Sequence, residues 1–238
     1  MLFSSCFVAA SALVGSAFGA PAQHSERAAA VVYDSETGFT FAEHKVAYTL
    51  SASIAVRVAV PSSAQAGQPY DAVFQIIVPN QVGWAGIAMG GSMVYNPLLV
   101  GWANGQQTQA STRWATAHAQ PQIYNNAQLQ KLTAGNRANG THWQFTVKCT
   151  GCTSYQGRTG STTTLNPKGG NRMALVISNG KPQQPSNANS NLVMHEGPIY
   201  WTQSFPEGAN ANFGELVRRN GGTTTSDGEV PTNGSVKA

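Results

Sequence analysis

A methionine that follows two glycines is the most unusual chemical feature of the sequence. In the run WAGIAMGGSMVYNPLLVGW, an apolar stretch ends at Met89, two glycines permit a sharp turn, and Met93 follows on its far side. A thioether presented from a turn at the end of a strand is well placed to bind a metal centre. Methionine is more often an adaptable core side chain, so this pattern alone leaves both roles open.

A histidine in a distant loop offers the complementary ligand. His195 lies in the run NSNLVMHEGPIYW, where Met194 is an alternative ligand and an ordinary surface role is an alternative for the histidine itself. A thioether and an imidazole together give six-coordinate, low-spin haem iron with a raised reduction potential. Met93 and His195 are about a hundred residues apart, so only tertiary folding could place them on opposite sides of one porphyrin. The sequence has no CxxCH motif, so such a haem would be non-covalent, of the b type.

The elements that must position these residues are β-strands. Every even position from Val46 to Val60 is apolar, which predicts one half-buried strand, bent or broken at most once, that Pro61 ends. Short apolar runs between Gly, Pro, Asn and Ser clusters predict further strands at 72–78, 84–89, 98–102, 111–119, 142–149, 172–178 and 199–203. This spacing is typical of an all-β, two-sheet antiparallel sandwich. No full-length amphipathic helix is predicted, and 125–132 is at most a turn or short helix.

Two cysteines in the run KCTGC offer another chemistry. In an oxidising compartment the simplest interpretation of Cys149 and Cys152 is a structural disulfide. A redox dithiol and half of a zinc site are the alternatives. Neither has support, because the sequence shows no second CxxC, no paired histidines and no βαβ pattern around the motif.

The N-terminal residues have the pattern of a secretion signal. A short polar start is followed by an apolar core at 7–18, too short to span a bilayer, and then by small residues. No second apolar run of spanning length follows, so we expect a secreted, extracellular protein that does not engage a membrane. Asn139 and Asn233 begin Asn-x-Ser/Thr sequons and are possible glycosylation sites.

Composition and motifs argue against several other functions. The net charge is +4 and the pI about 9.1, but Lys and Arg are scattered singly apart from the pair Arg218-Arg219 near the tail, which does not fit nucleic-acid binding. The sequence has no G-x-S-x-G, no HExxH and no close carboxylate pair of a hydrolase. The alternative function is a haem-free carbohydrate-binding sandwich. Its stacking platform would use the tryptophans, which are more simply explained by packing in the core or haem pocket: Trp84, Trp102, Trp114, Trp143 and Trp201.

Several ordered motifs resemble the cytochrome domain of fungal cellobiose dehydrogenases, a DOMON-like haem-binding sandwich. The matching runs, between Tyr33 and about Glu215, are YDSETGFTF, WAGIAMGGSMVYNPLLVGWANG, STRWATAHAQP, HWQFTVKCTGC and LVMHEG. The resemblance implies a DOMON or immunoglobulin-like sandwich with haem b at one edge. It also implies Met93, not Met89, and His195 as the axial haem-iron ligands, and a disulfide between the cysteines of the CxxC.

The resemblance further implies a one-electron carrier. Such a protein would receive electrons from a flavin dehydrogenase or another donor and pass them to extracellular acceptors such as ferric iron, quinones or the copper of polysaccharide monooxygenases. With both axial positions filled, we expect a redox carrier, with iron-reductase-like activity at most, and no catalytic residue.

The chain departs from cellobiose dehydrogenases in lacking a G-x-G-x-x-G fingerprint, so a free-standing, monomeric cytochrome of the extracellular iron reductase type is expected. The expected parts are a signal peptide (1–19), an N-terminal extension (20–30), a haem b cytochrome domain (31–216) and a disordered, linker-like tail (217–238).

Overall fold

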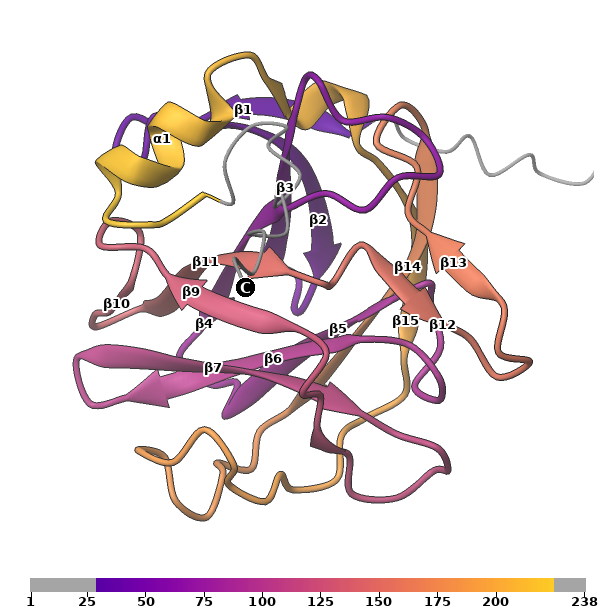
Figure 1. The fold of residues 1–238 in the computed structure, drawn as a ribbon. Helices are drawn as coiled ribbons and strands as arrows, with labels where there is room; N and C mark the ends of the chain where they lie inside the picture. Colours follow the sequence, from indigo (N-terminus) through magenta and orange to yellow (C-terminus); the bar gives the residue numbers. More distant parts are fainter. Residues whose placement is uncertain (1–28, 225–238) are drawn as a thin grey trace, which may run out of the picture.

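Two large β-sheets pack face to face in the computed structural model, which describes residues 29–224 (Figure 1). The predicted all-β sandwich of mostly antiparallel strands is therefore confirmed. The first sheet comprises β1 (Ala30–Tyr33), β2 (Thr40–Ala47), β3 (Ser53–Pro61), β4 (Ala72–Pro79), β9 (Gln128–Lys131), β10 (Arg137–Ala138), β11 (His142–Thr150) and β16 (Ala209–Asn210). The second has the order β15-β14-β5-β6-β7-β8 and comprises β5 (Trp84–Met89), β6 (Leu98–Asn104), β7 (Gln107–Trp114), β8 (Gln122–Ile123), β14 (Gly170–Ser178) and β15 (Ile199–Ser204).

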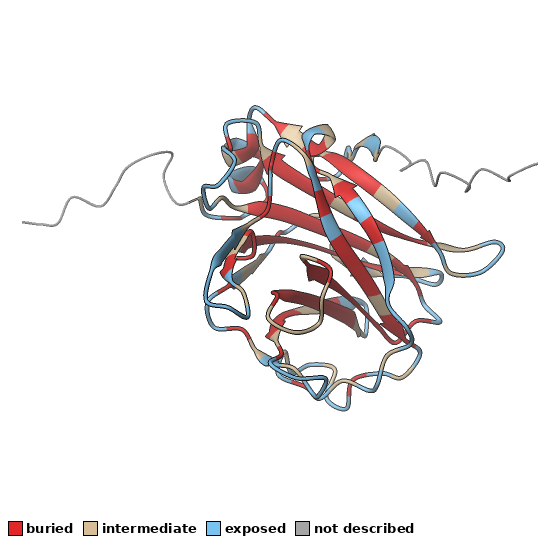
Figure 2. Ribbon diagram, turned by 90° about the vertical axis from the view of Figure 1, so that its right-hand side faces the viewer, coloured by how far each residue is buried: buried red, intermediate tan, exposed pale blue. Residues whose placement is uncertain are grey.

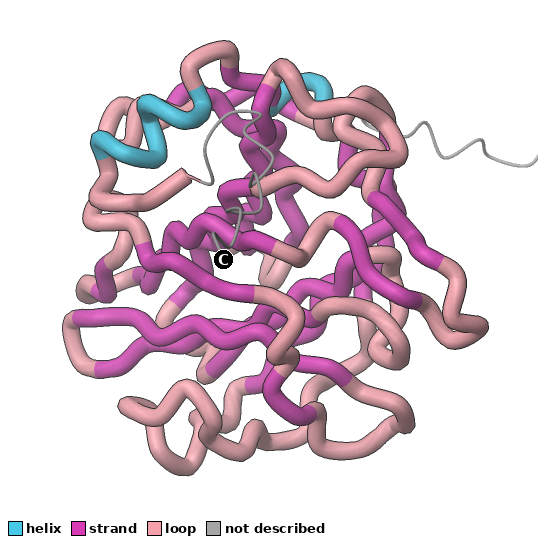
Figure 3. The backbone as a smooth tube through the Cα atoms, in the orientation of Figure 1, coloured by secondary structure: helices cyan, strands magenta, loops and turns pink. Residues whose placement is uncertain are grey.

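Smaller elements complete the chain around the sandwich. A two-stranded hairpin is formed by β12 (Ser154–Gln156) and β13 (Thr162–Thr164). The helical elements are a 3-10 turn, η1 (Pro206–Gly208), and one α-helix, α1 (Phe213–Arg219), drawn in cyan in Figure 3. No helix in the described part of the chain is long and apolar enough to cross a membrane.

The main core lies between the two sheets, where the strands of both layers are buried (Figure 2). Side chains alternate along each strand, so one face of each sheet supplies the core. Phe74 and Phe145 come from the first sheet, and Ile87 and Leu99 come from the second. Burial of large apolar side chains contributes about 1.5–3 kcal/mol each, which makes this interlayer the main source of stability.

The region predicted as one long strand at 46–60 is a hairpin. β2 ends at Ala47, β3 begins at Ser53, and these two residues pair with each other. The Thr49 side chain accepts hydrogen bonds from two backbone N–H groups of the turn at 3.3 and 3.1 Å, and Leu50 at the tip is exposed. The register pairs even-numbered residues with even-numbered ones, so the apolar alternation has the same parity on both sides of the turn. The sequence pattern therefore gives no sign that the chain turns here.

Three other predicted segments differ most from the structure. The strand predicted at 111–119 begins earlier, at Gln107, and ends at Trp114, shortly before an exposed loop at 116–120. The segment 125–132 contains a strand, β9, because its backbone pairs with the end of β11. The predicted tail boundary at Leu216 falls inside α1, whose Phe213, Leu216 and Val217 pack against the first sheet.

Some predictions fall on residues that the structure does not describe. These are the signal peptide (1–19), most of the N-terminal extension (20–28), the sequon at Asn233 and the last part of the tail (225–238).

A stack of two rings joins the sheets at one edge. The rings of His44 on β2 and Trp201 on β15 are nearly parallel, with centroids 5.0 Å apart. The Trp201 Nε1 group donates to Gln203 Oε1 at 3.0 Å, and Gln203 Nε2 donates to the Ala42 carbonyl at 3.2 Å. Burial lowers the pKa of His44, because the charged imidazolium is poorly solvated there.

We predict that His44 makes the fold sensitive to acid. Its pKa in the folded state lies below the value of about 6.5 expected for the unfolded chain, so the unfolded state binds the proton more tightly. The contribution of His44 to stability is therefore complete above about pH 6.5 and is lost as the pH falls from there through the folded-state pKa. Urea unfolding at about pH 8 and about pH 5 should show a smaller loss of stability for His44→Phe than for the wild type. His118→Phe, in an exposed loop, is the control, and an unchanged pH dependence in His44→Phe would contradict the prediction.

Candidate cofactor site on the six-stranded sheet

The candidate site lies on the face of the six-stranded sheet that points away from the main core. Ala85, Ile87 and Met89 of β5 belong to the core, so the residues between them face outward. Outward side chains of neighbouring strands form two small apolar clusters. The Met93 cluster contains Ala88, Leu98, Ala115 and Ala174, and the Trp84 cluster contains Trp84, Val100 and Trp102.

Met93 packs on the first of these clusters, just beyond the end of β5. Gly90 and Gly91 have φ values of +94° and +76°, in the left-handed region that favours glycine. A Cβ atom on Gly90 would overlap Asn96 Oδ1 and Tyr155 Oη. The double glycine is therefore required by the turn that brings Met93, half-buried, onto the outer face of the sheet.

Tyr155 fixes the turn that carries Met93. Its hydroxyl lies 2.8 Å from Asn96 Oδ1 and 3.1 Å from the Met89 carbonyl, and the Asn96 amide donates to the Val94 carbonyl at 2.8 Å. Burial raises the pKa of Tyr155 to about 12, so the hydroxyl stays protonated and can donate at neutral pH. Sequence reasoning missed Tyr155, because its partners lie about sixty residues away.

His195 lies at the other end of β5. Its ring meets the Trp84 ring edge-on, with centroids 6.0 Å apart and an interplanar angle of 82°. The Nδ1 atom lies 2.6 Å from the Glu196 carbonyl. A carbonyl can only accept, so Nδ1 donates, and in the neutral imidazole this leaves on Nε2 the lone pair that a metal requires.

The loop that carries His195, residues 179–198, crosses the outer face of the six-stranded sheet. Figure 1 shows it as the orange chain at the bottom of the molecule, between β14 and β15. Side chains of the sheet donate hydrogen bonds to its backbone carbonyls. They are Trp84 to Val193 (3.1 Å), Trp102 to Pro185 (2.7 Å), Gln109 to Ser186 (3.3 Å), Arg113 to Ala188 (2.6 Å) and Ser190 (2.9 Å), and Ser178 to Met194 (2.9 Å).

The two predicted ligands thus lie at opposite ends of one strand, on one face of one sheet. The six residues of β5 span about 17 Å at the usual rise of a strand, so both side chains would have to extend over the middle of β5 to meet one iron atom. The other two methionines of these motifs are placed differently. Met89 is fully buried in the main core on the opposite face, and the side chain of Met194 is 90% exposed.

The outward positions between the two ends are small or apolar, among them Gly86, Ala88 and Ala174. Gly86 is covered by its neighbours, because a Cβ there would lie 2.8 Å from Val100 Cγ1 and 3.2 Å from Trp84 Cζ3. A thioether and an imidazole are the donor pair that suits a haem with two axial ligands.

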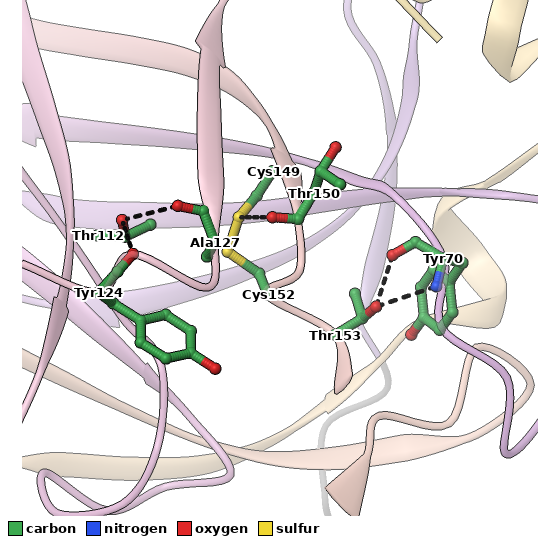
Figure 4. Close-up of a disulfide and its surroundings, with 8 residues drawn as sticks. All are labelled: Tyr70, Thr112, Tyr124, Ala127, Cys149, Thr150, Cys152 and Thr153. Carbon is green, nitrogen blue, oxygen red and sulfur yellow. Dashed lines mark hydrogen bonds between the residues drawn. A yellow bond between two sulfur atoms is a disulfide. The ribbon is translucent and has the colours of Figure 1, made fainter. Parts of the chain in front are cut away.

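The predicted disulfide between Cys149 and Cys152 is present at the end of β11 (Figure 4). Both cysteines are fully buried, and their Cα atoms are 5.8 Å apart. Beside them, the Thr112 hydroxyl is 3.2 Å from the Tyr124 carbonyl and 3.5 Å from the Ala127 carbonyl. The disulfide closes the short segment at the end of β11, and Gly151 within this segment lies against the backbone of Asn126 and Ala127 in the loop that follows β8.

The tryptophans do not form an exposed platform. All five lie in the described part of the chain, where four are buried and Trp114 is half-buried. Trp114 stacks on Tyr124 with centroids 4.7 Å apart, and Trp143 donates to the Val82 carbonyl at 3.0 Å. Packing is the role that the structure gives them, as the strand pattern predicted.

Comparison with known proteins identifies the family. The sequence matches the cytochrome domain of cellobiose dehydrogenase over residues 32–215. The chain belongs to this family of cytochrome domains. A curated relative of this cytochrome domain, the pyrroloquinoline quinone-dependent pyranose dehydrogenase of Coprinopsis cinerea, is 36% identical over 165 residues, which cover 68% of the chain. The chain spans only 22% of the length of that relative.

Solved structures show the same fold as this cytochrome domain. The cytochrome b domain of pyranose dehydrogenase from Coprinopsis cinerea superimposes with a TM-score of 0.70 at 28% identity, covering 82% of this chain and 97% of that one. The cytochrome domain of Myriococcum thermophilum cellobiose dehydrogenase gives a TM-score of 0.73 at 21% identity, covering 83% and 99%. The sandwich of this cytochrome domain is thus the fold of both.

The turn before Met93 should tolerate alanine at Gly90 poorly. Gly90→Ala forces a side chain into the left-handed region and against Asn96 and Tyr155, so we predict a loss of about 3 kcal/mol or more in the free energy of unfolding. Gly105→Ala is the matched control, because Gly105 also has a positive φ, +62°, but open space around it. That variant should lose only about 1 kcal/mol. Equal losses in urea titrations of the two variants would refute the steric argument.

Proposed function

We propose that this cytochrome domain is a secreted one-electron carrier that holds haem b between Met93 and His195. The observation that carries the proposal is the position of a thioether and an imidazole at the two ends of β5, on the same outward face. The hydrogen bond from His195 Nδ1 to the Glu196 carbonyl supports it, because in the neutral imidazole it selects the tautomer with the lone pair on Nε2. When bound, haem supplies reversible one-electron exchange between ferric and ferrous iron.

The protein's contribution is to hold two ligands that suit both oxidation states. Met93 would supply a soft thioether that favours the ferrous state, and His195 would supply a neutral nitrogen. The turn before Met93 is fixed by Tyr155, and the loop of His195 is fixed by the donors of the sheet. Ligands held this way would move little on electron transfer, and a haem bound by both would have no open coordination site for substrate chemistry.

The partners of the carrier follow from the same family. We propose a dehydrogenase, flavin-dependent or quinone-dependent, as the electron donor, because the relatives carry this name. Ferric iron, a quinone or the copper of a polysaccharide monooxygenase would be the acceptor. The haem-free carbohydrate-binding alternative has less support, since its platform would need exposed tryptophans.

Absorption spectra of the purified protein test the two ligands. The wild type should show a Soret band and, after reduction with dithionite, the sharp α and β bands of low-spin haem b. Met93→Leu should lose these features in the reduced state and lower the reduction potential, because the soft ligand is removed. His195→Ala should lose low-spin haem in both states. Met194→Ala, next to His195 but exposed, should match the wild type. A wild-type spectrum in Met93→Leu or in His195→Ala would remove that residue from the site.

Secretion should leave a glycan at Asn139. This residue is exposed in the turn between β10 and β11, where its Oδ1 atom accepts from the N–H groups of Thr141 and His142 at 2.9 Å. Protein secreted by a eukaryotic host should shift to lower mass after glycosidase treatment, and Asn139→Gln should reduce or abolish the shift. An identical shift in Asn139→Gln and wild type would exclude Asn139 as a glycan carrier.

A further inference from the structure

Arg113 of β7 is a buried cation with no carboxylate partner. It is 2% exposed, and the ion pairs among the described residues do not include it. The contrast is Arg57 in the other sheet, whose Nε atom lies 2.7 Å from Glu43 Oε2. Burial lowers the pKa of Arg113, although a guanidinium stays charged at neutral pH. A buried charge is costly, so its hydrogen bonds must compensate for the loss of water.

These hydrogen bonds join three separate segments of the chain. Arg113 Nε donates to Ser111 Oγ at 2.9 Å, and Nη1 donates to the Pro121 carbonyl at 3.2 Å. Nη2 donates to two carbonyls of the His195 loop, those of Ala188 at 2.6 Å and Ser190 at 2.9 Å. The rigid planar fork of arginine can bridge such widely spread acceptors at once, and lysine, with a single nitrogen, cannot.

A neighbouring side chain ties the same loop at a second point. In the amide orientation that satisfies both partners, Gln120 donates to the Leu192 carbonyl at 3.1 Å and accepts from the Leu192 N–H at 3.0 Å. A polar cavity of about 300 Å³ lies here, lined by Arg113, Gln120, Asn189 and Asn191 among others. This stretch of the loop is therefore held against the sheet by hydrogen bonds beside the polar cavity and by the packing of Leu192 on the Trp84 cluster.

We propose that Arg113 is a positioning residue for His195. Arg113 holds the loop backbone at residues 188–190 against the sheet. Trp84 and Ser178 then bind the carbonyls of Val193 and Met194, directly before the histidine. The imidazole is thereby kept at its end of β5, where the proposed iron would need it. This inference rests on the proposed function, since it assigns Arg113 a role through a ligand of the haem.

The spectrum of Arg113→Gln tests the assignment. A displaced loop lets His195 leave the iron, so a high-spin fraction should appear, and added imidazole should restore the low-spin spectrum by replacing the missing ligand. A general loss of structure would not be rescued in this way. Arg113→Lys keeps the charge but not the fork, so it should show the same high-spin fraction and the same rescue. A wild-type spectrum in both variants overturns the proposal, and a wild-type spectrum in Arg113→Lys alone shows that charge, and not positioning, is the role.

Arg57→Gln is the matched control, since Arg57 is the other largely buried arginine with strong hydrogen bonds but lies in the opposite sheet. It should lower stability and leave the low-spin spectrum unchanged; an imidazole-rescued high-spin fraction in this variant would overturn the assignment.

Hydrogen exchange on the same proteins needs no haem. Arg113→Gln should speed exchange in 184–195 and not in 90–97 around Met93, and unchanged exchange in 184–195 would refute positioning. If the wild type binds no low-spin haem, the proposed function fails, while the exchange result still decides whether Arg113 holds the loop.

Discussion

The hydrogen bonds from sheet side chains to the carbonyls of the 179–198 loop are the interaction on which the proposed site depends. Ordering one residue costs about 1–2 kcal/mol of backbone entropy, and this loop has no strand or helix of its own to offset that cost. Each hydrogen bond contributes about 1 kcal/mol net, somewhat more when the donor is charged. Several donors are therefore needed, and the tryptophans and Arg113 supply them from the rigid surface of the sheet.

The six-stranded sheet has a different task on each face. The inner face packs Ile87, Leu99 and Leu175 into the main core and gives the strands their fixed register. The outer face has small residues and two limited apolar clusters, and the 179–198 loop crosses it in place of a second layer of strands. Because the core has already fixed the sheet, the outer face presents its functional groups without having to stabilise the fold.

The sequence was informative where a feature is local and failed where it depends on pairing. Trp84–Met89 was predicted with correct bounds, because a continuous apolar run ends at a double glycine. The turn at 48–52 was missed because the register preserves the parity of the apolar positions, and α1 was missed because seven residues hold too little periodicity. Arg113 gave no signal, since its partners outside β7 are backbone carbonyls, which every residue carries and no motif can reveal.

The two ends of the candidate site are restrained in different ways, and this decides which parts of the sequence are free to change. The Met93 turn depends on residue type, because only glycine fits the backbone at Gly90. The His195 loop is bound through its main chain, so most of its own side chains can be exchanged, lengthened or charged without breaking an anchor. Sequence drift is therefore tolerated at the exposed positions of 181–192 and resisted at the anchoring donors and at the buried Ser190. The exposed surface of the loop can thus diversify while His195, the proposed ligand, keeps its place.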